Sequence, residues 1–186
     1  ARPDALEEQL IEQVSYSIGD FIQHIPIECK PKLFELLNFM ITQFGVVTEE
    51  RRKMCILETI LFIIQSLEDK IQPVSDNLLT ILLSSLSVDG KFDNLILNGS
   101  NTYCLILTIS LIIFYVGKSA KAYLTPFLQI IDQVLQSNSP LDINATTKLI
   151  GNIGLTMGID IISSLPEGVG IINHMFELLF ANLTSD

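Results

Sequence analysis

The chain has 186 residues, of which 48% are hydrophobic and 17% are charged, so its composition excludes a disordered segment. Its 11 Lys and Arg residues against 21 Asp and Glu residues give a net charge of −10, which repels phosphate backbones and excludes nucleic acid as an expected partner. The same charge favours encounters with basic peptides and proteins, although it equally serves solubility.

Apolar residues recur at helical spacing from the start of the chain. The first predicted helix has an apolar stripe between Leu6 and Ile18, interleaved with acidic residues, and Pro26 and Pro31 interrupt the pattern after it. Because Pro31 is a favoured first-turn residue, a second helix is expected to begin there, and it ends at Gly45.

Two further helices follow before the one long connection in the chain. Thr48 is the expected N-cap of a helix that continues to about Leu67, and Pro73 opens the next one, which ends near Leu86. A polar stretch containing Gly90 then leads to residue 98.

Four more helices are predicted after that connection, and no segment shows the period-two alternation of a strand. Ser100 or Asn101 begins the first of these, and Asp142 or Asn144 begins the third. The longest apolar run, from Cys104 to Val116, is too short to span a membrane and indicates a helix buried on most sides. The predicted ranges are 100–117, 119–136, 142–158 and 167–183.

The junctions between helices recur every 40 to 50 residues, which is the period of HEAT and armadillo arrays. We therefore expect an all-α superhelix, a HEAT-repeat solenoid of about four stacked helical hairpins with about eight helices. The whole chain, 1–186, is one array. Its predicted units are 1–30 (partial), 31–69, 70–117, 118–158 and 159–186 (partial). A four-helix bundle or an irregular α-helical domain is the alternative.

Three segments then resemble central repeats of the importin-β (karyopherin-β) family of nuclear transport receptors. Residues 68–77 (EDKIQPVSDN) are similar to its inter-helix turn, and residues 117–128 (GKSAKAYLTPFL) to its Gly-x-x-Phe-x-Lys-Tyr-Leu pattern. Residues 150–158 (IGNIGLTMG) resemble its second-helix motif, with Asn152 where Asp is usual. That departure, and a long connection over residues 89–98, indicate a divergent member and weaken an expected acidic–basic ladder between repeats.

The resemblance implies a carrier without catalytic activity that shuttles between the cytoplasm and the nucleus. Its partners would be a basic cargo or adaptor helix, the Phe-Gly repeats of nucleoporins, and Ran-GTP. The alternatives are a structural HEAT scaffold for a multiprotein complex, of the phosphatase or condensin type, and a helical domain that binds lipid. Because the chain begins without Met or a leader, a fragment of a longer protein is expected.

Two groups of residues are the candidate partner-binding positions. Glu49, Glu50 and Glu58 would meet a basic partner, although solvated helix faces explain them equally well. Clefts between first helices would be lined by apolar side chains, for which an ordinary core position is the alternative. These apolar candidates are Phe34, Leu37, Leu79, Leu82 and Phe127.

No catalytic, metal or cofactor site is predicted. The two histidines, His24 and His174, lie far apart and lack metal-ligand spacing to Cys or Asp. No strand precedes the Gly151 and Gly154 pair, so these glycines do not form a phosphate-binding loop. The three cysteines are widely separated, which indicates reduced and buried thiols rather than a disulfide framework.

Overall fold

The computed structural model describes residues 13–14, 16–87, 100–137, 139–158, 169–170, 173–174 and 177, and helix is the only regular secondary structure among them. The prediction of an all-α chain is therefore confirmed. Most of the predicted first and last helices, and the connection after residue 87, lie outside the described residues.

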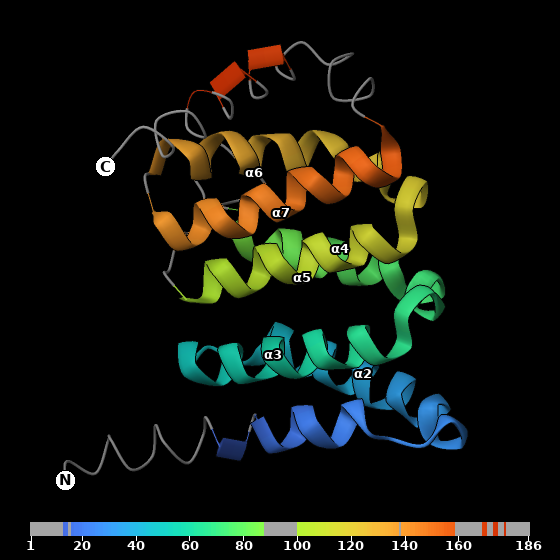
Figure 1. Cartoon of the computed structure of the whole chain (residues 1–186). Helices are drawn as coiled ribbons and strands as arrows, with labels where there is room; N and C mark the ends of the chain where they lie inside the picture. Colours follow the sequence, from blue (N-terminus) through green and yellow to red (C-terminus); the bar gives the residue numbers. More distant parts are fainter. Residues whose placement is uncertain are drawn as a thin grey trace, which may run out of the picture.

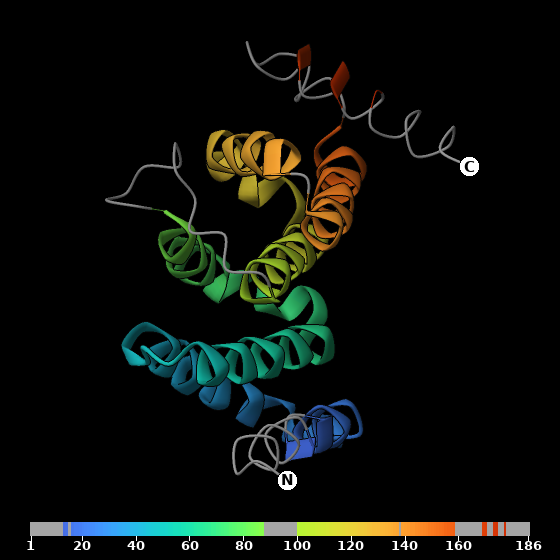
Figure 2. The same cartoon turned by 90° about the vertical axis from the view of Figure 1, so that its left-hand side faces the viewer.

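The six labelled α-helices form two layers. Figures 1 and 2 show α3 (Glu50–Leu67), α5 (Ser100–Val116) and α7 (Pro140–Met157) side by side in one layer. In that layer α5 contacts both α3 and α7. The second layer contains α2 (Lys30–Val46), α4 (Ser75–Leu86) and α6 (Leu124–Ser137). Each of these helices contacts the next helix along the chain, so these six helices form a stack of three helix pairs.

Two 3₁₀ helices of seven residues each carry the chain from one pair to the next. They are η2 (Glu68–Val74), after α3, and η3 (Gly117–Tyr123), after α5. Each begins with a residue of positive φ, 55° at Glu68 and 56° at Gly117, and buries its fourth residue in the core. The Gln72 Nε2 atom donates to Ser119 Oγ at 3.1 Å, so the two junctions also contact each other.

These junctions correct the predicted number of helices. The described residues form five uninterrupted helical segments, not about eight helices, because η2 and η3 continue the helical backbone where tight turns were expected. A break in helical structure does occur after residue 23, before η1 (Ile27–Cys29) leads into α2.

Helix boundaries agree with the sequence in part. Pro31 lies in the first turn of α2 as predicted, but Gly45 does not end that helix, which continues through Val46. Thr48 is not the N-cap of α3, because Glu49 occupies that position and no side chain caps the helix. Neither Asp142 nor Asn144 begins α7, which starts earlier at a proline in its first turn.

The apolar helix α5 lies at the centre of the stack, where it contacts α3, η2, α4, η3 and α7. Among its described side chains only Phe114 is exposed, so the prediction of a helix buried on most sides is confirmed. In the described part of the chain, one helical stretch, Asn101–Gln136, is long and apolar enough to cross a membrane by length and composition. Of its most apolar window, 56% is buried inside the protein.

Candidate functional site

Four of the five apolar candidates belong to the core. Leu37, Leu79 and Phe127 have no exposed surface, and Leu82 has only 1%. Phe34 is half-buried and packs against the same core. A fully buried side chain has no surface to offer a partner, so these residues hold the layers together, which is the alternative stated for them above.

The two acidic candidates at the start of α3 do not form an acidic patch. Glu49 pairs with Arg52 through Oε2 and Nε at 2.8 Å, and Glu50 accepts a hydrogen bond from the Asn101 amide on α5. The five residues from Glu49 to Lys53 contain two carboxylates and three cations, a local charge of +1. The charge that would attract a basic partner is therefore not concentrated at this position.

The third acidic candidate, Glu58, lies two turns further along α3. Its side chain is half-buried, and its charge acts on the Cys104 thiol of α5. Burial and, to a smaller extent, the Glu58 carboxylate raise the pKa of Cys104 to about 12, because both disfavour the thiolate. Glu58 is thus part of the contact between α3 and α5.

A hollow crosses the outer face of α3, α5 and α7. This α3–α5–α7 groove has a volume of about 410 Å³, within the range of small binding sites. Its lining combines leucines with polar side chains from all three helices. The lining residues are Leu61, Gln65, Leu107, Ser110, Leu111, Lys148, Gly151, Asn152 and Leu155.

None of the groove residues was predicted as a binding residue. The available signal was the set of apolar residues left over after the core stripes are assigned. On α5, Ile106, Ile109 and Ile113 are fully buried, whereas Leu107 and Leu111 are only half-buried on the adjacent face. On α7, Leu155 is 78% exposed although it is apolar. A second apolar face on a helix that already has a core face indicates a surface with a further contact.

A hydrogen-bonded pair fixes the floor of the groove. The Asn152 Nδ2 atom on α7 donates to the Ser110 carbonyl oxygen and to Ser110 Oγ on α5, each at 2.9 Å. Asn152 thus occupies the position where the family resemblance implies an acidic ladder residue. Its amide makes the inter-helix contact directly, and its hydrogen-bond partner on α5 is the uncharged Ser110.

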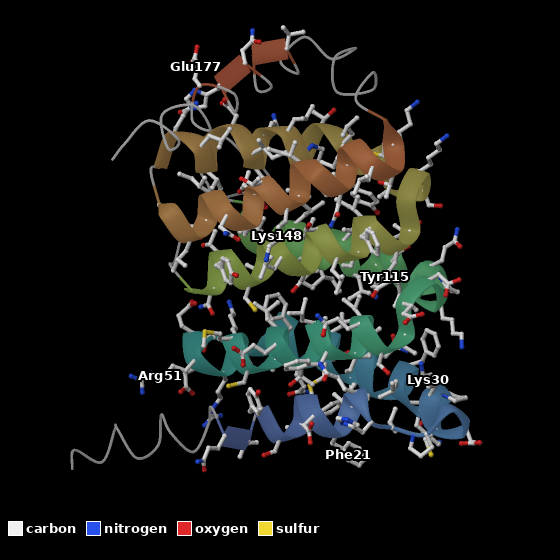
Figure 3. All side chains as sticks on the ribbon, viewed as in Figure 1. Phe21, Lys30, Arg51, Tyr115, Lys148 and Glu177 are labelled. Atoms are coloured by element: carbon white, nitrogen blue, oxygen red, sulfur yellow. The ribbon has the colours of Figure 1, made fainter. Side chains whose placement is uncertain are left out.

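Lys148 is the one ionisable side chain in the groove lining. It is exposed, and it makes no ion pair or hydrogen bond with any residue that the structure describes. Figure 3 shows it on the face where α7 and α5 lie side by side. The groove is therefore apolar and amide-rich with a single positive charge.

A second hollow, of about 90 Å³, lies where α2, α3, α4 and α5 meet. Glu50, Lys53 and Asn101 contribute to its wall. The Asn101 Oδ1 atom is buried there without a hydrogen-bond partner. This cavity has room for water but is smaller than sites that bind organic ligands.

The described residues contain no group of three His, Cys, Asp or Glu side chains able to hold a metal ion. His24 pairs with Asp20 at 3.3 Å, and His174 lies 3.8 Å from Glu177, so each histidine has a local partner on the surface. The cysteine prediction is wrong for Cys29, which is exposed at the end of η1. Cys104 is buried as expected, and Cys55 is intermediate.

Comparisons with protein-family models, curated proteins and solved structures found no match to this chain.

Proposed function

We propose that this chain is a non-catalytic, protein-binding segment of an α-solenoid of the HEAT type. The observation that carries the proposal is the stacking of three helix pairs with equivalent junctions. The positive-φ residues Glu68, Gly117 and Gly158 each follow a helix of the α3–α5–α7 layer. Their spacings are 117 − 68 = 49 and 158 − 117 = 41 residues, of which the second lies within the HEAT period of about 40–47 residues and the first slightly exceeds it.

Stacking of this kind creates extended surfaces suited to protein partners. Each helix pair buries one apolar face against its neighbour, and the helices of one layer then present a continuous outer surface. The α3–α5–α7 groove lies on such a surface, and every helix of the layer contributes to its lining. Partner binding in this groove requires no catalytic group.

In its finer form, the proposal is that the chain belongs to an importin-β-type receptor that carries cargo through the nuclear pore. The motif resemblance of residues 68–77, 117–128 and 150–158 supports this form, and η2 and η3 occupy the first two of these segments. The net charge of −10 supports attraction of a basic cargo or adaptor helix. A structural scaffold shares the fold but has no affinity for transport partners.

The test is capture of the intact chain on two immobilised ligands, a Lys/Arg-rich helix and a Phe-Gly repeat peptide. We expect retention on both, with retention on the basic helix decreasing as salt rises from low to physiological ionic strength. Circular dichroism should first show that the helices of the tested protein are intact. If such protein is retained on neither ligand, the result would contradict the transport form and favour a scaffold. Bound lipid in native mass spectrometry would favour the lipid-binding alternative instead.

Two exposed leucines of α7 make a matched pair of variants for the binding surface. Leu155 is 78% exposed in the groove, and Leu141 is 61% exposed outside it. If partners use the groove, Leu155→Ser lowers retention of at least one ligand and Leu141→Ser does not. Equal effects of the two substitutions would place the binding surface elsewhere.

A further inference from the structure

We infer that the α3–α5–α7 groove takes an amphipathic helix that has an acidic flank, and that Lys148 selects this helix through a carboxylate. This inference rests on the proposed protein-binding function and names the partner chemistry at its site. It differs from the basic partner suggested by the net charge, because the groove lining has a cation and no acid.

The spacing of the groove favours a helix as its occupant. Leu61 on α3, Leu111 on α5 and Leu155 on α7 place an apolar side chain from each of the three helices in the groove lining, and the axes of neighbouring packed helices generally lie about 8–10 Å apart. A bound helix repeats its apolar face every seven residues, which is about 10.5 Å. A segment of about fifteen residues, with apolar residues at i, i+7 and i+14, therefore extends about 21 Å and can place an apolar residue against each of the three helices.

The polar groups of the groove favour an acidic flank. Lys148 is exposed and has no partner among the described residues, and Gln65 on α3 is an exposed amide with no hydrogen bond to them. In a chain of net charge −10, an unpaired cation inside an apolar groove attracts a carboxylate and disfavours a basic segment at the same position. The Asn152 amide is already bonded to Ser110, so the floor stays in place whether or not a partner binds.

The test measures binding of the full chain to three fluorescent peptides by anisotropy. Each peptide has about eighteen residues, a covalent staple that keeps it helical, and leucines at i, i+3, i+7, i+11 and i+14. Two positions beside the leucine stripe are Glu in the first peptide, Gln in the second and Lys in the third. The three peptides thus differ only in the charge that they present to Lys148.

We expect the Glu peptide to bind about two- to fivefold more tightly than the Gln peptide, the size expected of one exposed charge pair. Lys148→Gln should remove that difference, and Lys148→Glu should make the Lys peptide the tightest of the three. Lys121→Gln is the matched control, because Lys121 is an exposed lysine of η3 outside the groove, and it should leave the difference unchanged. Leu155→Ser should weaken all three peptides.

Two outcomes would overturn the inference: no binding of the Glu peptide, or a preference for it that persists in Lys148→Gln. Neither bears on the transport proposal, which depends on capture by the basic helix and the Phe-Gly peptide. Conversely, if the Glu peptide binds through Lys148 while those two ligands fail, the transport form is wrong and the groove assignment stands.

Discussion

The side-chain amide of Asn152 donates two hydrogen bonds to Ser110, one to its carbonyl oxygen and one to its hydroxyl, and these bonds join α7 to α5. Ser110 is 2% exposed and Asn152 is half-buried, so the pair lies at the edge of the core. An amide suits this position because it supplies a donor for the backbone carbonyl, which a carboxylate lacks.

Asn152→Asp should therefore destabilise the protein, by about 1–2 kcal/mol. The carboxylate can accept a bond from the Ser110 hydroxyl, which reverses the direction of that bond, but it faces the carbonyl oxygen without a proton between them. Urea unfolding monitored by circular dichroism measures the change in the free energy of unfolding. Asn144→Asp, at an exposed position of the same helix, is the control and should change stability little. Equal stability of Asn152→Asp and the parent protein would show that the pair does not contribute.

Glu68→Gly should stabilise the protein by about 1 kcal/mol. Glu68 has φ 55° and ψ −130°, a conformation that costs a non-glycine residue about 1–3 kcal/mol. Glycine removes this strain at a smaller cost in unfolded-state entropy. The thermal midpoint and the urea midpoint should both rise. The neighbouring substitution Asp69→Gly serves as the control, because Asp69 has no positive φ, and it should lower both midpoints.

Gly19→Ala should lower stability although alanine is the better helix former. A Cβ atom at Gly19 would lie 2.5 Å from the Phe62 ring of α3, which is closer than side-chain atoms approach. We expect a loss of about 1–3 kcal/mol from the displaced ring. Phe62→Leu in the same chain should recover part of the loss, so a double-mutant cycle gives a favourable coupling between the two substitutions. Additive effects would contradict the contact.

The buried thiol of Cys104 should make stability depend on alkaline pH. Its pKa is raised from 9.0 to about 12 in the folded chain, so the unfolded state loses this proton first. The free energy of unfolding should then fall as pH rises from about 9 to about 12, by up to about 1.4 kcal/mol per pH unit. Cys104→Ala should show a shallower decrease over that range. An identical slope in both proteins would mean that other groups carry the whole dependence.

The same burial predicts an order of thiol reactivity. Cys29 is exposed, Cys55 is intermediate and Cys104 is buried. Alkylation at pH 8, followed by mass spectrometry of peptides, should modify Cys29 first and Cys104 only after the chain is unfolded, because the thiolate is the reactive form and access is required. Modification of Cys104 at the rate of Cys29 in folded protein would contradict its burial.

The all-helical class could be predicted from the sequence because apolar residues at helical spacing share one face, and can be buried together, only if the segment is a helix. The junctions were located correctly near Leu67 and Gly117, but their 3₁₀ geometry was not predicted. A residue such as Glu68 carries no local signal for positive φ, so the strain there depends on the packing of α3 and η2 against α5. The α3 cap was also misplaced: Thr48 suits an N-cap, but the helix starts at Glu50 with Glu49 at the N-cap position and no side-chain cap.

The groove was not found from the sequence because its residues are unremarkable one at a time. Leu61, Leu107 and Leu155 are each ordinary helical leucines, and only the alignment of three separate helices brings them to one surface. The acidic candidates at the start of α3 show the opposite situation. Glu49 and Glu50 are conspicuous in the sequence, but the basic residues beside them cancel their charge.

The two layers of the stack differ in how closely their helices contact each other. In one layer, α5 packs on both α3 and α7. In the other layer, α2, α4 and α6 make fewer contacts with one another. Such a stack has direction-dependent stiffness. When the stack bends, the closely packed layer of α3, α5 and α7 keeps nearly the same length. The spaces between α2, α4 and α6 in the other layer become wider or narrower. A bound partner should accordingly change the curvature of the stack. The helices of the groove, α3, α5 and α7, should keep their spacing while the other layer opens or closes.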